Sequence, residues 1–260
     1  MVGVAGRAEL PSADQKVLRA RDKKKETLSM DNRERRQREE LPSQYAYVAD
    51  DILSLCKPRV GIWLDVGTGP GGLALALARQ VPRSVLVLLD PNPKALGKAL
   101  QAAGELGLAN RVVPMVGPAE AMPLPDSCID LVVSRGSMFF WEDPVRGISE
   151  VHRVLRPGGK AMIGGGLGRE YPAWARREFI RRQRENQRKR GPEAMRRFRE
   201  VRSPESFHRW AGEAGLRDFT VVGEGGLDED CPEAGVGIWL RFAKQTPLAL
   251  TSYVRSPGRG

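Results

Sequence analysis

An aspartate and three closely spaced glycines are the residues whose types and spacing could bind a charged cofactor. Asp65 stands two residues before Gly67, and Thr68, Gly69 and Gly71 follow in the run D-V-G-T-G-P-G. Glycine adopts positive φ readily and lets a ligand approach the backbone, and exposed N–H groups at a helix start favour a negative group. We therefore expect this segment to bind a small anionic or zwitterionic cofactor.

The flanking segments predict how this run is positioned. An apolar run, 60–64, precedes it and an Ala/Leu-rich segment, 73–78, follows it, which is typical of a strand, a tight turn and a helix start. The next apolar run, 85–89, ends in Asp90 and Pro91. A carboxylate there can accept two hydrogen bonds from the cis hydroxyls of a ribose, so we expect Asp90 and Pro91 to contact a nucleoside.

Two classes of cofactor fit the glycines. Gly67, Gly69 and Gly72 match the dinucleotide fingerprint G-x-G-x-x-G. Asp65 favours a different ligand, because a buried carboxylate opposes a pyrophosphate but suits a ligand with an ammonium and a sulfonium group. The run D-V-G-T-G-P-G resembles motif I of the class I S-adenosylmethionine-dependent methyltransferases, in which the turn holds the amino-acid end of the cofactor and the acid helps to orient it.

Two further runs carry the same resemblance, and they follow in the order that the family has. They are P-L-P-D-x-x-I-D-L-V-V-S, which ends at Ser134, and L-R-P-G-G-K, which we interpret as a helix-to-strand turn at 155–160. The resemblance covers about 41–244. It implies an α/β, Rossmann-like fold with a seven-stranded, mostly parallel sheet of order 3-2-1-4-5-7-6 and an antiparallel last strand. It also implies in-line transfer of a methyl group from S-adenosylmethionine, with Ser134 near the cofactor.

The segment expected to hold the adenine departs from the family pattern. Residues 117–126 resemble the run G-D-A-E-x-L-P-F-P-D, in which the acid after the glycine accepts a hydrogen bond from the adenine amino group. Pro118 stands at that position and has no side-chain donor or acceptor. Adenine recognition then depends on the Ala119 backbone, on Glu120 or on stacking by Met122, and Glu120 could instead be a solvent-facing acid.

A helical lead-in is predicted over 31–55, with an apolar face that includes Tyr45. In proteins that this chain resembles, such a helix lies against the cofactor pocket. Tyr45 is therefore a candidate for covering the cofactor, and the alternative is that it packs on the sheet.

The methyl acceptor is expected where the fourth and fifth strands end. Arg135, Met138, Phe139 and Phe140 follow the fourth strand, and Gly165 lies in a glycine-rich stretch after the fifth. The N-P-P-Y or D-P-P-Y run of nucleic-acid and amide N-methyltransferases is not found after the fourth strand. Aromatic walls suit an apolar or polarizable small-molecule acceptor, although the rings could simply pack on the sheet edge.

The basic charge is concentrated in one segment. The 260-residue chain carries a formal net charge of +10, and 169–202 contains 13 Arg or Lys and 5 Glu residues. We interpret this segment as a helical cap that selects the substrate. The alternatives are contacts with RNA or an acidic protein through the arginines, a solvated helix pair that only covers the core, and a non-catalytic cofactor-sensing or nucleic-acid-binding module.

Length and composition set the remaining expectations. A 31–244 methyltransferase domain is predicted between a flexible basic tail, 1–30, and a C-terminal tail, 245–260. No apolar run approaches the length of a membrane span, so we expect a cytoplasmic protein without a membrane partner. Three widely spaced cysteines suggest neither a disulfide framework nor a metal site. No general base stands out, as expected where alignment and exclusion of water supply much of the rate.

Overall fold

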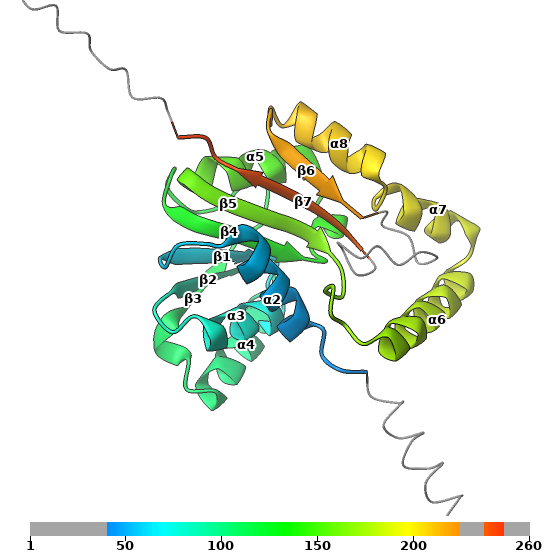
Figure 1. The fold of residues 1–260 in the computed structure, drawn as a ribbon, viewed down its shortest axis with the longest axis horizontal. Coiled ribbons are helices and arrows are strands. Elements are labelled where there is room, and N and C mark those ends of the chain that lie inside the picture. Colours follow the sequence, from blue (N-terminus) through cyan, green and yellow to red (C-terminus); the bar gives the residue numbers. More distant parts are fainter. Residues whose placement is uncertain (1–40, 224–236, 247–260) are drawn as a thin grey trace, which may run out of the picture. The chain divides into compact units, whose positions relative to one another are not determined.

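A seven-stranded sheet lies at the centre of the second of the two units into which the chain divides, Met1–Pro42 and Ser43–Gly260. The computed structural model describes residues 41–223 and 237–246. The strand order is β3-β2-β1-β4-β5-β7-β6, and β7 runs antiparallel to both of its neighbours, which confirms the predicted topology (Figure 1). The strands are β1 (Ile62–Val66), β2 (Val85–Asp90), β3 (Val112–Val116), β4 (Ile129–Arg135), β5 (Leu155–Gly165), β6 (Phe219–Val222) and β7 (Ile238–Ala243).

Helices cover both faces of the sheet (Figure 1). Helices α2, α3 and α4 contribute to one hydrophobic cluster, and α5 and α8 contribute to another. The helices are α2 (Tyr45–Cys56), α3 (Gly72–Gln80), α4 (Pro93–Glu105), α5 (Pro144–Val154), α6 (Ala173–Arg190), α7 (Pro192–Glu200) and α8 (Pro204–Glu213), and the short 3-10 turns are η1 (Ala109–Arg111) and η2 (Met138–Phe140).

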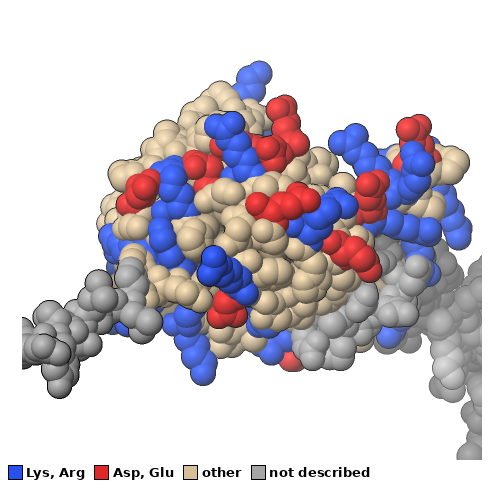
Figure 2. All heavy atoms as spheres, turned by 90° about the horizontal axis from the view of Figure 1, so that it is seen from above, with Lys and Arg blue, Asp and Glu red and all other residues tan. Residues whose placement is uncertain are grey.

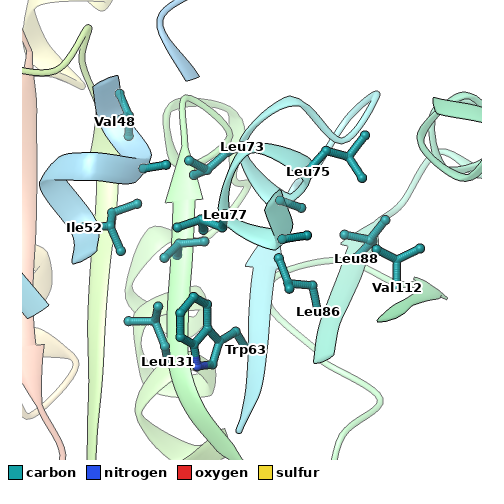
Figure 3. Packing of buried hydrophobic residues seen from close by; sticks show 14 of the residues in the cluster. Val48, Ile52, Trp63, Leu73, Leu75, Leu77, Leu86, Leu88, Val112 and Leu131 are labelled. Atoms are coloured by element: carbon teal, nitrogen blue, oxygen red, sulfur yellow. The ribbon is translucent and has the colours of Figure 1, made fainter. Parts of the chain in front are cut away.

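Alternation along the buried strands explains the two clusters. Leu86 and Leu88 of β2 belong to the cluster under α2, α3 and α4, whereas Val87 and Leu89 belong to the cluster under α5 and α8. Successive side chains of a strand point to opposite faces, so a parallel sheet covered on both sides needs a continuous apolar run. Figure 3 shows the first cluster, in which side chains of α2, α3 and the strands meet. The buried layers hold the strand ends at fixed positions.

The first strand begins two residues later than the apolar run predicts. Val60 is 52% exposed, whereas Asp65 and Val66 pair with Leu88 and Leu89 of β2. Pairing with the buried neighbouring strand therefore decides the boundary, and Asp65 lies within β1 rather than after it.

The L-R-P-G-G-K run is also part of a strand rather than a separate turn. In the pairing of β4 with β5, Ile129 lies opposite Leu155 and Leu131 lies opposite Lys160, so the extra residues form an irregularity within β5. Gly158 has a φ of 78°, which allows the bend.

The basic segment is helical as predicted, and it forms two helices, α6 and α7, between β5 and α8. Gly191 separates them with a φ of 88°. Within 41–223 and 237–246, none of the helices combines the length and apolar character that crossing a bilayer requires. The predicted tail 1–30 and nearly all of the predicted tail 245–260 lie outside the described residues.

Candidate active site

The glycine turn after β1 is held by backbone hydrogen bonds to the end of β2. The Gly67 and Thr68 N–H groups both donate to the Leu89 carbonyl, at 2.8 and 3.1 Å. Gly67, Gly69 and Gly71 have φ values of 67°, 55° and 86°, a region that favours glycine. A Cβ on Gly69 would meet no atom within 4 Å, so open space lies beside this part of the turn.

Gly67 serves a different purpose from Gly69. A Cβ at Gly67 would lie 2.1 Å from the Cβ of Ser137, which follows β4. The absence of a side chain therefore lets the turn approach the loop after β4, which carries the predicted acceptor residues.

Asp90 ties the turn to β2 and is largely buried. Its Oδ2 accepts the Gly69 N–H at 2.8 Å and its Oδ1 accepts the Asn92 N–H at 2.8 Å. Each carboxylate oxygen can accept a second hydrogen bond, so the carboxylate can still receive two hydroxyl groups. The neighbouring Pro91 is exposed.

Asp65 is a buried carboxylate at the same edge. The Thr68 hydroxyl donates to its Oδ2 at 2.8 Å. Burial raises the pKa of Asp65 to about 7, although hydrogen bonds from Thr68 and the Ala74 backbone lower it. Such a desolvated carboxyl group gains a strong electrostatic interaction when a cationic ligand group arrives.

Tyr45 lies over the start of α3. A Cβ on Gly72 would lie 2.3 Å from the Tyr45 ring, so the ring rests against this glycine. The Cζ atom of Arg135 lies 5.3 Å from the centre of the same ring. Tyr45 is thus beside both the glycine turn and the loop after β4, and its contact with the cofactor stays a prediction.

The loop after β3 gives Glu120 a structural role. The Glu120 Oε1 accepts the N–H groups of Glu142 and Asp143 at 2.8 and 3.3 Å, which links this loop to the start of α5. Ala119 and Met122 are buried in the core. Contact of Ala119 or Glu120 with adenine stays a prediction, and the burial of Met122 does not favour stacking by its side chain.

Ser134 belongs to a network of hydroxyl groups. Its Oγ lies 2.6 Å from the Ser137 Oγ, which donates to the Val66 carbonyl at 2.7 Å and accepts from the Trp141 indole N–H at 3.2 Å. Ser134 is completely buried. The network joins the end of β1 to the loop after β4. Ser137 and Trp141 lie in the run 135–141 that was expected to face the acceptor, but the sequence gave no indication of their hydrogen bonds.

A cavity of about 370 Å³ lies where β4, β5 and β7 approach α6 and α7. Four of the five predicted acceptor residues line it: Arg135, Phe139, Phe140 and Gly165. Met138 does not, because its side chain is 1% exposed and packs in the core under α5 and α8. The 3-10 turn η2 separates these neighbours, so that Met138 is buried while Phe140 is 82% exposed.

Several lining residues were not singled out individually from the sequence, although four of them lie in the predicted cap segment 169–202. They come from the start of α2, the cap and the start of β7, and they are Gln44, Phe179, Gln183, Phe198, Arg202, Gly237 and Ile238. The apolar side of the second cap helix is a signal for Phe198, and the cap segment ends at Arg202. Gln44 and Gln183 lack a local signal, because they reach the cavity only through the packing of distant elements.

Arg135 joins the two parts of the site. Its Nε donates to the Gly166 carbonyl at 2.9 Å. With the Gln44 amide turned as its neighbours require, the Gln44 carbonyl accepts from both terminal nitrogens of Arg135, at 3.2 and 3.1 Å. Burial lowers the pKa of Arg135, whereas the charge of Asp65 raises it. The guanidinium group therefore lines the cavity within the electrostatic reach of the cofactor-side carboxylate.

Part of the charge of the cap is neutralised locally. Glu178 lies 2.7 Å from both Arg181 and Arg182, and Glu185 lies 3.0 Å from Lys189. Figure 2 shows basic and acidic side chains interspersed over the visible face. Contact of the cap with RNA or an acidic protein stays a prediction.

The described residues hold few candidates for other chemistry. No group of three His, Cys, Asp or Glu side chains in this part of the chain is arranged to hold a metal ion. Cys56 and Cys128 are free thiols, and burial raises the pKa of Cys56 to about 11. Cys231 lies outside the described residues.

The sheet order, the glycine turn and the strand-end carboxylates define a methyltransferase type of α/β fold, and similar proteins agree. Residues 64–163 match the family described as a methyltransferase domain. A solved protein of Methanococcus maripaludis, described as an S-adenosyl-L-methionine-dependent methyltransferase, aligns with a TM-score of 0.63 and 29% identity, covering 80% of this chain and 88% of that one. The matched domain, the aligned structure and the sheet order together support a class I S-adenosylmethionine-dependent methyltransferase.

Curated relatives match over a shorter region. A chloroplastic 2-methyl-6-phytyl-1,4-hydroquinone methyltransferase of Oryza sativa subsp. japonica is 39% identical over 117 residues, which are 45% of this chain and 32% of that protein. A ubiquinone/menaquinone biosynthesis C-methyltransferase of Geobacter sulfurreducens is 39% identical over 103 residues, 38% of this chain and 40% of that protein. The chain therefore spans less than half the length of these relatives.

Proposed function

We propose that this protein transfers a methyl group from S-adenosylmethionine to a small aromatic acceptor of the hydroquinone type. The observation that carries the proposal is the cavity between the ends of β4, β5 and β7 and the cap, because it brings four predicted acceptor residues together around aromatic walls. The names of the rice and Geobacter relatives support a quinone-type acceptor.

The residues of the turn fit the cofactor. The space beside Gly69 would admit its amino-acid part, and the buried Asp65 carboxylate would attract its ammonium group. The Asp90 carboxylate, positioned by Gly69 and Asn92, would accept the ribose hydroxyls. When bound, S-adenosylmethionine supplies a methyl group already activated by its sulfonium sulfur.

The cavity residues would orient the acceptor and exclude water. Phe139 and Phe140 offer rings against which an aromatic acceptor can pack. The Arg135 guanidinium favours the ionised form of a nearby phenolic hydroxyl, because an opposite charge lowers the pKa of that hydroxyl. An ionised phenol is the more electron-rich nucleophile, and its proton would pass to solvent.

The described lining of the cavity contains no carboxylate, histidine or lysine side chain. A general base on these elements is therefore not part of the proposal. Alignment of the acceptor with the donor methyl group and exclusion of water would supply much of the rate.

The test is an acceptor screen followed by release of S-adenosylhomocysteine and by mass spectrometry of the product. Hydroquinone, 2,5-dihydroxybenzoate and larger hydroquinones would be compared with amines and with short RNA. We expect a gain of one methyl group on a hydroquinone-type acceptor and loss of turnover in Asp90→Ala. Turnover of RNA or an amine with every hydroquinone inert would contradict the proposal.

A further inference from the structure

Arg202 lies between two aromatic rings. Its Cζ atom is 3.8 Å from the centre of the Phe139 ring and 4.0 Å from the centre of the Phe198 ring. Phe139 belongs to η2 after β4, whereas Phe198 belongs to the cap helix α7. The guanidinium group is therefore stacked at the junction of the sheet edge and the cap, a favourable arrangement for a planar cation.

The charge of Arg202 is not balanced within the described structure. No described side chain makes an ion pair or a hydrogen bond with its guanidinium group, and burial alone lowers its pKa to about 10. Stacking leaves the edge of a guanidinium group, which carries its N–H donors, free to bind another group. A desolvated cation without an anion is costly, so a ligand anion at this edge would be stabilising.

Arg202 lines the acceptor cavity, so its unbalanced charge would act on a ligand bound there. Arg135 lines the cavity as well, and the described lining contains no acidic side chain. Arg135 already donates to Gly166 and faces Gln44. Arg202 is thus the cation of the cavity lining that is left for a ligand, whereas Arg181 and Arg182 of α6 are paired with Glu178.

We propose that Arg202 is a specificity-determining residue that binds an oxyanion, a carboxylate or a phosphate, on the methyl acceptor. This inference rests on the proposed function, since it concerns the same acceptor cavity. The aromatic walls would hold the ring of the acceptor, and the N–H groups along the edge of the Arg202 guanidinium group would donate side by side to two oxygens of its anionic group.

A purely structural role for Arg202 makes a different prediction. If Arg202 only connects the cap to the sheet through Phe139 and Phe198, its replacement lowers stability but changes the binding of neutral and anionic ligands by the same factor. A binding role changes the ratio of the two affinities.

The experiment measures affinity without turnover, by calorimetry with S-adenosylhomocysteine at saturation. The probes are two matched pairs: 2,5-dihydroxybenzoate with 2,5-dihydroxybenzamide, and 4-hydroxyphenyl phosphate with hydroquinone. We expect at least one anionic probe to bind tenfold or more tightly than its neutral partner, and the pair that does so identifies carboxylate or phosphate as the preferred group. Anionic probes that bind no more tightly than their neutral partners, or that do not bind, would overturn the inference.

Variants separate the roles of Arg202. In Arg202→Gln, the preference for the anionic probe should fall to within twofold of unity, and Arg202→Lys should retain part of it. Arg196→Gln, which removes the same charge from an exposed position of α7, should retain all of it. An equal loss for both members of a pair in Arg202→Gln, or a parallel loss of affinity for S-adenosylhomocysteine, would assign Arg202 to the cap or to the cofactor and overturn the inference.

Turnover distinguishes this inference from the proposed function. Equal binding and equal turnover of neutral and anionic hydroquinones would overturn the inference and leave the proposed function standing. An anion preference that depends on Arg202, with no release of S-adenosylhomocysteine for any hydroquinone, would support the inference and contradict the proposed function.

Discussion

The cofactor side and the acceptor side of the candidate site are held by different interactions. On the cofactor side, backbone N–H groups of Gly67 and Gly69 meet a carbonyl and a carboxylate at the end of β2. On the acceptor side, the cavity is bounded by side chains from η2 and from the cap, including Phe139 and Arg202. A site made of backbone groups restricts the sequence, because its turn requires glycine at several positions. A site made of side chains from separate elements can change its ligand through single substitutions.

The largest expected effect is on the cofactor side. Asp90→Ala removes an acceptor that holds two backbone N–H groups and is proposed to hold two hydroxyl groups. Hydrogen bonds to a charged group contribute about 1.5 to 3 kcal/mol each, so we expect the affinity for S-adenosylmethionine to fall at least about 100-fold. Calorimetry measures this change.

Asp218→Ala provides the matched control, because it removes the same carboxylate from an exposed position. Asp218 follows α8 and is distant from the glycine turn along the chain. It should bind the cofactor as the parent does. Equal affinity of Asp90→Ala and the parent, with both folded by circular dichroism, would remove Asp90 from the cofactor site.

Gly67→Ala and Gly69→Ala should differ in stability. Both positions have positive φ, which disfavours alanine by about 1 to 2 kcal/mol. At Gly67 the new Cβ also meets Ser137 at 2.1 Å, and such overpacking adds about 1 to 3 kcal/mol. Urea unfolding should show a loss of about 3 kcal/mol for Gly67→Ala and less than about 2 kcal/mol for Gly69→Ala. The reverse order would mean that contact with the loop after β4 does not restrict the turn.

Asp65 should make cofactor binding depend on pH. Because its pKa is about 7 in the free protein, the carboxyl group is mostly protonated at pH 6 and mostly ionised at pH 8. If the ionised form binds the cofactor, affinity at pH 6 should be about tenfold lower than at pH 8, and Asp65→Asn should abolish this difference. A calorimetric titration series across this range measures the effect, and an unchanged slope in Asp65→Asn would assign it to another group.

The same group has the opposite effect on stability. Its folded-state pKa lies above the ordinary value of 3.8, so the folded protein binds the proton more tightly than the unfolded chain. This contribution to stability is complete below about pH 4 and is lost as the pH rises through 7. Cofactor-free protein should therefore lose, between pH 4 and pH 7, a stabilisation that Asp65→Asn lacks.

The cofactor side could be predicted from the sequence more completely than the acceptor side. The glycine turn could be predicted because it depends on local periodicity and on residue types with few conformational alternatives, whereas the sheet order was implied by the resemblance to the class I methyltransferases. The start of β1 was misplaced, since Val60 and Val66 are equally apolar and only pairing with β2 separates them. Met138 was misassigned because a single 3-10 turn decides which side chain of η2 enters the core.

The cap contribution could be predicted only as a segment. Its helices and its charge are local properties, and both were expected. The meeting of Gln44, Phe179 and Arg202 around one cavity depends on elements separated by more than a hundred residues along the chain. The spacing of residues in the sequence does not predict which side chains from such distant elements will meet.

Phe140→Ala should have the smallest effect and should be confined to the acceptor side. Since Phe140 is 82% exposed, its removal should change the free energy of unfolding by no more than about 0.5 kcal/mol. The acceptor loses part of one apolar contact, so its KM should rise about threefold, while the affinity for S-adenosylmethionine stays the same. Steady-state kinetics and calorimetry on one preparation measure both. If affinity for the cofactor fell as much as affinity for the acceptor, the two sides would be coupled through the loop after β4, and the backbone-built turn would depend on the side chains that line the cavity.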